Sequence, residues 1–234
     1  MQRFFVKFPL SIDMTITEVD MVHQLTRVLR VAIWEHIVLF SGDGTEIEYE
    51  IIEMDKKSIW LRWRASRVPS TEPKKQVTLY QALPNKHEKI EYILQKGLEI
   101  GIGRFVFFRS DRSQRLLLSP NKIERFSVIA REALEQCGGT VMPEILFVER
   151  FPERTTTDSV ERIHIVLDTI WESTRISQYD NFQNIGLWVG PEGGWSNDER
   201  IKMKDNSFIF ARFWERVLRT ETAGIVISFG LLNW

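Results

Sequence analysis

The sequence has a single cysteine, Cys137, among 234 residues, so no disulfide can form within the chain. A reducing, cytoplasmic setting is therefore expected. Long hydrophobic runs are also absent, since the longest apolar stretch is about ten residues and a membrane-spanning helix needs about 20. The first residues mix basic with apolar side chains, which favours a strand over a signal peptide. We expect neither export nor a membrane anchor.

Strong net charge and several common catalytic motifs are missing as well. The formal net charge is −1 at pH 7, which excludes a bulk nucleic-acid binder of the histone type. Any RNA contact must then come from local basic clusters. The sequence contains neither a phosphate-binding P-loop nor the Gly-x-Ser-x-Gly elbow of serine hydrolases. The four histidines are isolated and lack metal-ligand spacing, so we expect no metal site.

Residues 1–70 have the pattern of a small β-barrel. Apolar residues alternate with glutamates over residues 46–51, and a similar alternation returns over residues 59–64 after a tight turn. Short alternating strands joined by tight turns are typical of barrels. The segment 67–75 contains two prolines and no apolar period, so we predict a linker there.

A helix predicted at residues 18–29 interrupts this β pattern. His23, Arg27 and Arg30 have helical spacing and are expected on one face. That face is either a solvated polar surface or a surface that contacts RNA phosphates, because the guanidinium group matches phosphate oxygens well.

Residues 71–234 predict an α/β domain. Strand-like apolar runs occur at residues 77–80, 105–108, 145–148, 163–167, 185–189 and 208–210. Helices are predicted at residues 86–99 and from Ser119 onward, the second with Ile123, Phe126, Ala130, Ala133 and Leu134 facing inward. Strands that alternate with helices favour a mostly parallel sheet with helices on both faces.

Two polar loops in this domain predict a ligand pocket. Residues 190–194, Gly-Pro-Glu-Gly-Gly, follow a predicted strand and precede Ser196, which has capping-box spacing with Glu199. A glycine-rich loop between a strand end and a helix start is where α/β proteins tend to bind ligands. The second cluster, residues 219–222, lies between another strand and the apolar run 223–232. Two loops at the ends of neighbouring strands can form two walls of one pocket.

The last twelve residues are almost free of charge and apolar nearly all round if helical. Such a helix must be buried, whereas chain ends usually lie at the surface. We therefore predict that it packs against a second copy of the chain in a homodimer.

The two loops resemble the paired signatures of the RsmE family, the SPOUT-class methyltransferases of 16S ribosomal RNA. The first signature lies at residues 190–199 and the second at residues 216–223. Further similar segments lie at residues 27–30, 81–84, 95–101, 109–113 and 129–133, so the resemblance covers nearly the whole chain.

The resemblance implies a specific fold and activity. It implies transfer of a methyl group from S-adenosyl-L-methionine to N3 of one uridine of 16S rRNA in the small ribosomal subunit. It also implies an RNA-binding PUA-like β-barrel over residues 1–70 and a SPOUT domain with a trefoil knot over residues 71–234. Members of the family work as homodimers.

The resemblance also suggests roles for individual residues. The expected cofactor-binding residues are Leu167, Gly190, Pro191, Glu192, Gly193, Gly194, Leu218, Thr220 and Ala223. Arg219 is the candidate for holding or polarising the uracil carbonyls, and Glu221 is a candidate for accepting the N3 proton. Alternatively, Glu192 and Glu221 only cap helices. The expected RNA-binding residues are His23, Arg27, Arg30, Lys86, Lys89, Arg109, Arg112 and Arg115.

The chain departs from the family pattern at Phe213-Trp214, where relatives usually carry leucine and glycine. Trp214 adds bulk near the expected adenine pocket. Two other functions stay open. One is a non-catalytic RNA-binding or ribosome-assembly protein, and the other is a SPOUT methyltransferase that acts on another RNA position.

Overall fold

The computed structural model describes residues 1–152, 163–171, 175–179, 181–213 and 215–233. The chain forms two compact units. The first comprises Met1–Glu72 together with Leu134–Met142, and the second comprises Pro73–Ala133 and Pro143–Trp234. No pattern in the sequence indicated that residues 134–142 return to the first unit.

The first unit contains a five-stranded sheet in the order β1-β3-β4-β5-β2. Its strands are β1 (Gln2–Phe5), β2 (Asp13–Ile16), β3 (His36–Phe40), β4 (Glu46–Met54) and β5 (Ile59–Arg67). Strands β1 and β3 pair in parallel, and the other pairs are antiparallel. The side chains of Phe4, Ile16, Leu25, Leu39 and Tyr49 belong to its hydrophobic core.

The alternation predicted for β4 is wrong at two glutamates. Glu46 and Glu50 are buried, and the pairing of β4 with β5 shifts register twice. A bulge of this kind changes the face that a side chain occupies. Glu46 forms ion pairs with Arg3, at 2.9 Å, and with Arg67, while Glu50 pairs with Arg64. The arginines offset the cost of burying these carboxylates.

The helix predicted at residues 18–29 is present but irregular. It begins as α1 (Val19–His23) and continues as a π-helical segment, η1 (Gln24–Val28). His23, Arg27 and Arg30 are all exposed. However, the wide π turn alters the helical register, and Arg30 has a left-handed φ of 54° beyond the helix end. The three residues therefore do not lie on one continuous α-helix, and their shared RNA-binding face stays a prediction.

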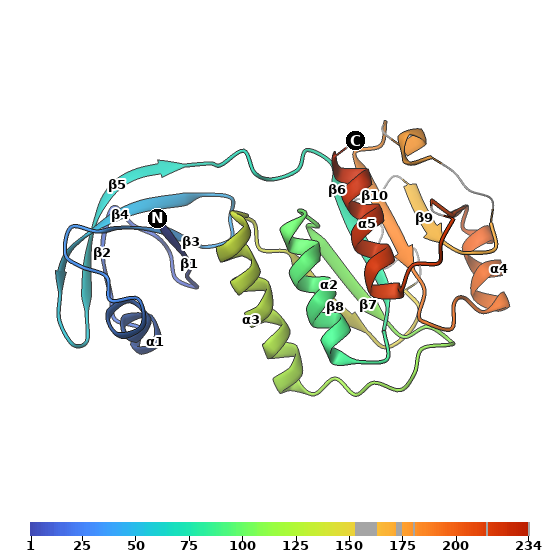
Figure 1. The fold of residues 1–234 in the computed structure, drawn as a ribbon, viewed down its shortest axis with the longest axis horizontal. Coiled ribbons are helices and arrows are strands. Elements are labelled where there is room, and N and C mark those ends of the chain that lie inside the picture. Colours follow the sequence, from blue (N-terminus) through green and yellow to red (C-terminus); the bar gives the residue numbers. More distant parts are fainter. Residues whose placement is uncertain (153–162, 172–174, 180, 214, 234) are drawn as a thin grey trace. The chain divides into compact units, whose positions relative to one another are not determined.

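The second unit contains a six-stranded sheet in the order β11-β9-β10-β6-β7-β8 (Figure 1). All five pairings are parallel, as the sequence predicted. The strands are β6 (Gln76–Ala82), β7 (Arg104–Phe108), β8 (Glu144–Val148), β9 (Ile163–Leu167), β10 (Asn184–Val189) and β11 (Ile209–Ala211).

Helices cover this sheet. They are α2 (His87–Glu99), α3 (Pro120–Cys137), α4 (Asn197–Asp205) and α5 (Thr220–Asn233), with a short 3₁₀ helix, η3, at Ile176–Tyr179. Helices α2 and α5 lie side by side, and α5 packs against β6 and β10 (Figure 1). On α3, Phe126, Ala130, Ala133 and Leu134 are buried as predicted, but Ile123 is exposed. Within the described residues, no helix is long and apolar enough to cross a membrane.

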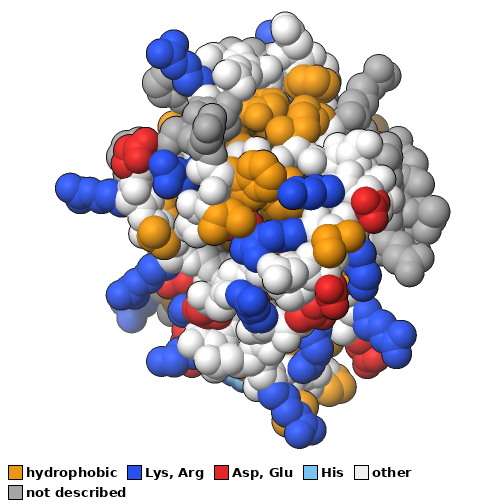
Figure 2. All heavy atoms as spheres, turned by 90° about the vertical axis from the view of Figure 1, so that its right-hand side faces the viewer, with side chains coloured by type: hydrophobic (Ala, Val, Ile, Leu, Met, Phe, Trp, Pro, Cys, Tyr) orange, Lys and Arg blue, Asp and Glu red, His pale blue; other side chains and the backbone are white. Residues whose placement is uncertain are grey.

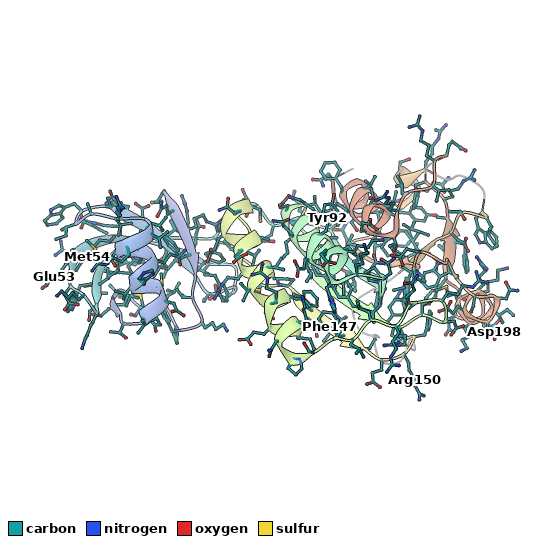
Figure 3. All side chains as sticks on the ribbon, turned by 60° about the horizontal axis from the view of Figure 1, so that its bottom comes forward. Glu53, Met54, Tyr92, Phe147, Arg150 and Asp198 are labelled. Atoms are coloured by element: carbon teal, nitrogen blue, oxygen red, sulfur yellow. The ribbon has the colours of Figure 1, made fainter. Side chains whose placement is uncertain are left out.

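An aromatic cluster fills the core that includes α4. Tyr80 stacks on Trp188 with 4.1 Å between ring centroids, and Phe208 packs on Trp188 at 5.0 Å. The indole N–H of Trp188 lies 3.0 Å from Nδ1 of buried His164. This histidine is therefore part of the core. Asp198 in the first turn of α4 and Tyr92 on α2 are labelled in Figure 3.

Candidate active site

The glycine-rich loop, residues 190–196, connects the carboxyl end of β10 to α4. Ser196 Oγ accepts a hydrogen bond from the backbone N–H of Glu199, and the Glu199 carboxylate accepts one from the N–H of Ser196, which confirms the capping box. Gly194 has a φ of +65°, and a Cβ on Gly190 would lie 3.2 Å from the ring of Trp195. The backbone conformation therefore favours glycine at position 194, and a side chain at position 190 would crowd Trp195.

Thr220 joins the second polar loop to the first. Its hydroxyl donates a hydrogen bond to the carbonyl of Gly190 at 2.6 Å and accepts one from Nε2 of Gln81 at 2.8 Å. Gln81 is buried on β6. One side chain therefore connects β6, the end of β10 and the start of α5.

A cavity of about 680 Å³ lies between the two loops, a volume typical of small-molecule sites. Its apolar lining includes Leu167, Val189, Leu218, Ala223 and Ile227. Its cationic lining includes Lys89, Arg112, Arg200, Arg212, Arg216 and Arg219. Figure 2 views the unit from the α4 side, where hydrophobic side chains gather between Lys and Arg side chains.

A lysine and two glutamates tie the glycine-rich loop to two helices. Lys89 Nζ of α2 lies 2.7 Å from Glu192 Oε1 and 3.3 Å from Glu221 Oε2. The N–H of Asn85 also donates to Glu192, at 3.2 Å. Burial alone would lower the pKa of Lys89, but its hydrogen bonds to Glu192 and Glu221 raise it above the ordinary value. Burial would raise the pKa of Glu192, but hydrogen bonds, first from Lys89, lower it.

The wall at the end of β9 contains a second ion pair. The buried carboxylate of Asp168 accepts from Nε of Arg200, on α4, at 2.7 Å. Next to it, the indole N–H of Trp195 donates to the carbonyl of Leu167 at 2.9 Å. These contacts join the glycine-rich loop and α4 to the end of β9.

The segment after β7 supports the loop from another side. Buried Glu199 accepts hydrogen bonds from the hydroxyl of Ser110 at 2.7 Å and from the N–H of Asp111 at 3.1 Å. Arg112 donates to the carbonyl of Gly193 at 3.0 Å. This basic segment, expected to contact RNA, therefore also holds the glycine-rich loop.

The residues present fit an adenosyl ligand. Backbone groups of the glycine-rich loop can hydrogen-bond the edge of an adenine, and Leu167 and Leu218 supply apolar walls for its faces. The backbone N–H groups in the first turn of α5 and the nearby carboxylates provide polar partners for the other end of the ligand, away from the adenine.

Comparison with known proteins identifies the family. A family model described as an RNA methyltransferase domain matches residues 71–230, and one described as an RNA methyltransferase PUA domain matches residues 17–62. Ribosomal RNA small subunit methyltransferase E of Buchnera aphidicola is 30% identical over 210 residues, which cover 87% of this chain and 81% of that protein. The chain belongs to the ribosomal RNA small subunit methyltransferase E family, RsmE.

Solved structures agree with this assignment. The protein Lpg2936 from Legionella pneumophila, in complex with the cofactor SAM, superposes with a TM-score of 0.85 at 25% identity, covering 99% of this chain and 96% of that chain. The Neisseria gonorrhoeae methyltransferase E shares the fold, with a TM-score of 0.84 at 24% identity over 97% of this chain and 95% of that chain. The chain thus joins the S-adenosylmethionine-dependent rRNA methyltransferases, with a PUA domain and an α/β RNA methyltransferase domain.

The RsmE cavity gathers every residue predicted to bind the cofactor. Leu167, Gly190, Pro191, Glu192, Gly193, Gly194, Leu218, Thr220 and Ala223 all line it. Arg219 lines it too and is exposed. Glu221 is not among the lining residues, and its carboxylate faces Lys89. This position does not favour Glu221 as the acceptor of a proton from the substrate.

The predicted RNA-binding residues divide into two groups. His23, Arg27, Arg30, Lys86, Arg109 and Arg115 are exposed. Lys89, which is partly buried, and Arg112, which is exposed, contact the glycine-rich loop and line the cavity. Their contacts give them a structural role at the RsmE site that the sequence did not reveal.

Several lining residues escaped sequence reasoning. Trp195, Arg200 and Arg216 all line the cavity. Trp195 follows the glycine motif directly, and its bulk beside Gly190 was the one local signal that could have been used. The contact of Arg200 with Asp168 spans 32 positions in the sequence and leaves no local pattern. Trp214 lies outside the described residues.

Proposed function

We propose that this protein transfers the methyl group of S-adenosylmethionine to N3 of one uridine in the 16S rRNA of the small ribosomal subunit. The observation that carries the proposal is the cavity itself. It lies between the two RsmE signature loops and has both apolar walls for an adenosyl group and an exposed arginine at its edge.

The cofactor residues hold and orient the donor. S-adenosylmethionine, when bound, supplies an activated methyl group on a sulfonium sulfur. The glycine-rich loop and the start of α5 would fix its position, which is the main contribution a protein makes to this type of reaction. Glu192, at the cavity wall, provides negative charge that favours the cationic ligand.

Methylation of N3 requires three coordinated changes. The N3–H bond breaks, the bond between N3 and the methyl carbon forms, and the electrons of the sulfur–methyl bond stay on sulfur. We assign Arg219 to the uracil carbonyls, where its guanidinium group stabilises the negative charge that N3 acquires as its proton leaves. The proton passes to water, since Glu221 is engaged by Lys89.

RNA binding is assigned to exposed basic residues on both units. Arg27, Arg30 and His23 lie on the PUA-like unit, while Lys86, Arg109 and Arg115 lie on the catalytic unit. Contacts of this kind with phosphate fix the position of the RNA without reading its sequence. The identity of the target uridine would then depend on the folded shape of the ribosomal RNA around it.

The homodimer is also part of the proposal. Helix α5 buries one side against β6 and β10, but Val226 and Phe229 remain exposed on it, as does Tyr92 on neighbouring α2. A second copy of the chain would cover these apolar side chains. The trefoil knot expected for the SPOUT domain belongs to the same family-based proposal.

One experiment tests the activity. Purified protein is incubated with methyl-labelled S-adenosylmethionine and with small ribosomal subunits that lack base methylation, and the modified nucleotide is located by mass spectrometry. We expect a single 3-methyluridine in 16S rRNA. A modification at another RNA position would favour the alternative methyltransferase, and the absence of any methylation by folded protein would favour a non-catalytic RNA-binding protein.

A further inference from the structure

Lys89 was predicted to bind RNA, but its ammonium group lies between two carboxylates beside the cavity. It is the cationic centre of a cluster of three side chains from three elements: Lys89 from α2, Glu192 from the glycine-rich loop and Glu221 from α5. Its side chain is only 21% exposed, and the side chains of the two glutamates are 30% and 13% exposed. We call these three residues the carboxylate clamp.

We propose that Lys89 is a positioning residue for the methyl transfer reaction: it holds Glu192 against Glu221 and so keeps the glycine-rich loop in the shape that binds the adenosyl donor. The inference rests on the proposed function, because it assumes that this cavity receives S-adenosylmethionine.

Lys89 contributes to the geometry of the glycine-rich loop. Besides the clamp, the Glu192 carboxylate accepts a hydrogen bond from the N–H of Asn85, which lies two residues before α2. The same loop is held on its other side by Arg112, which donates to the Gly193 carbonyl. Lys89 therefore links this loop directly to α2 through its side chain. Without it, the loop keeps its contacts with Asn85 and with the segment after β7 but loses its ion pair with α2.

Lys89 also balances the charge of the carboxylate clamp. The two carboxylates share one ammonium group, so removal of Lys89 leaves two negative charges next to each other in a partly buried place. Such a pair repels, and the pKa of one member rises. With Lys89 present, the carboxylate clamp has a net charge of −1 beside the cavity, which favours a cationic ligand. Lys89 also prevents repulsion between the glycine-rich loop and α5.

The central test compares S-adenosylmethionine dissociation constants, measured by calorimetry, for the wild type and for Lys89→Met. We expect binding to weaken about tenfold or more, because a partly buried, charge-assisted contact is lost. The Michaelis constant for the donor should rise in parallel, while the turnover number at saturating donor should change less than about threefold. A purely structural role in RNA binding would leave the donor affinity unchanged.

Lys96→Met is the matched control. Lys96 lies on the same helix and also forms an ion pair, with Glu99 at 2.7 Å, but it does not line the cavity. We expect its donor affinity to equal that of the wild type. Lys89→Arg should restore most of the affinity, since the guanidinium fork can engage both carboxylates.

Two further measurements separate positioning from a loss of folding. Lys89→Met combined with Glu221→Gln removes the repulsion and should recover part of the affinity. The ratio of the Lys89→Met and wild-type dissociation constants should also fall as the pH is lowered from about 7.5 to about 5.5, because one of the two unpaired carboxylates becomes protonated. Use of the ratio cancels the titration of the ligand.

The outcomes distinguish the two proposals. If the wild-type dimer or monomer does not bind S-adenosylmethionine, both are overturned. If the wild type binds and Lys89→Met binds equally well, or if the double variant and the lower pH restore nothing to a folded Lys89→Met protein, the positioning role alone is overturned.

Discussion

At the scale of single residues, Arg219 and Glu221 lie close in sequence but have different surroundings in the site. The arginine lines the cavity at the start of α5, whereas the glutamate, two positions later, faces Lys89. Successive side chains at a helix start point in different directions, so two polar neighbours need not share a task. Proximity in sequence alone suggested a joint catalytic role, and the geometry assigns them to different surroundings.

Replacement of Arg219 should affect the reaction more than donor binding. For Arg219→Ala we expect single-turnover methylation to slow by about 100-fold, since a donor to the developing negative charge is lost. Donor affinity, measured by calorimetry, should change less than about threefold. Arg219→Lys keeps the charge and should recover part of the rate. Equal methylation rates for the alanine variant and the wild type would remove Arg219 from the mechanism.

At the scale of elements, α4 shows how one buried glutamate organises several segments. The Glu199 carboxylate caps its own helix through Ser196 and also binds Ser110 and Asp111 of the segment after β7. A capping residue that is 2% exposed thus links the start of α4 to a distant strand end. The polar contacts of the glycine-rich loop depend on this junction.

Loss of the Glu199 contacts should lower the stability of the catalytic unit. Glu199→Ala should reduce the free energy of unfolding of the catalytic unit by about 3 kcal/mol, because buried N–H and hydroxyl donors lose their partner. Ser196→Ala, which removes only the cap, should cost about 1 kcal/mol. Asp198→Ala, at an exposed position in the same first turn, should cost less than about 0.5 kcal/mol. Urea unfolding measures all three, and a similar loss in each would contradict the assigned role of Glu199.

Sequence patterns predicted the elements well because most of them depend on local periodicity. The six parallel strands, the capping box and the buried stripe of α3 all follow from spacing and polarity. The errors have tertiary causes. Glu46 is buried because Arg3 and Arg67 come to it from other strands, which no local pattern encodes. Ile123 lies in the first turn of α3 and is exposed, although the spacing of apolar residues on this helix predicted that it is buried.

In the candidate site, too, local features could be predicted from the sequence and tertiary contacts could not. The two loops could be predicted because glycine, proline and capping residues mark them in the sequence. The ion pairs that hold the loops could not, since Lys89 meets Glu192 across 103 positions and Arg112 meets Gly193 across 81. A basic residue that stabilises a loop and one that binds phosphate are indistinguishable until the fold brings their partners together.

At the scale of the whole molecule, RNA affinity and self-association are the properties to test. Both involve surfaces whose side chains are exposed in the single chain: the basic residues of the two units, and the apolar residues of α2 and α5. Exposed arginines bind phosphate in a manner that depends strongly on salt, whereas apolar surface does not.

The salt dependence of RNA binding tests the basic residues. Arg109→Ala combined with Arg115→Ala should weaken binding to the small-subunit RNA and lower the slope of log affinity against log salt by about one per lost phosphate contact. Lys96→Ala removes an exposed charge on α2 and should leave the slope unchanged. An unchanged slope in the arginine variant would exclude these side chains from the RNA contact.

The oligomeric state tests the apolar surface of α5. Phe229 and Val226 are 49% and 42% exposed in the single chain. Phe229→Glu should convert a dimer into a monomer in light-scattering measurements, since an unpaired carboxylate would be buried at the contact. Val28→Glu, which changes an exposed apolar residue of the first unit, serves as the control. A wild-type protein that is monomeric at micromolar concentration would contradict the dimer.

The hydrogen bonds of Thr220 have a consequence for the order in which this protein becomes active. The Gly190 carbonyl and Gln81 both depend on a hydroxyl from a helix that spans residues 220–233. During synthesis, the strands and the glycine-rich loop emerge well before that helix does. A nascent or truncated chain that stops near residue 215 would lack this hydroxyl and part of the pocket wall, so we expect it to bind the methyl donor more weakly than the full chain.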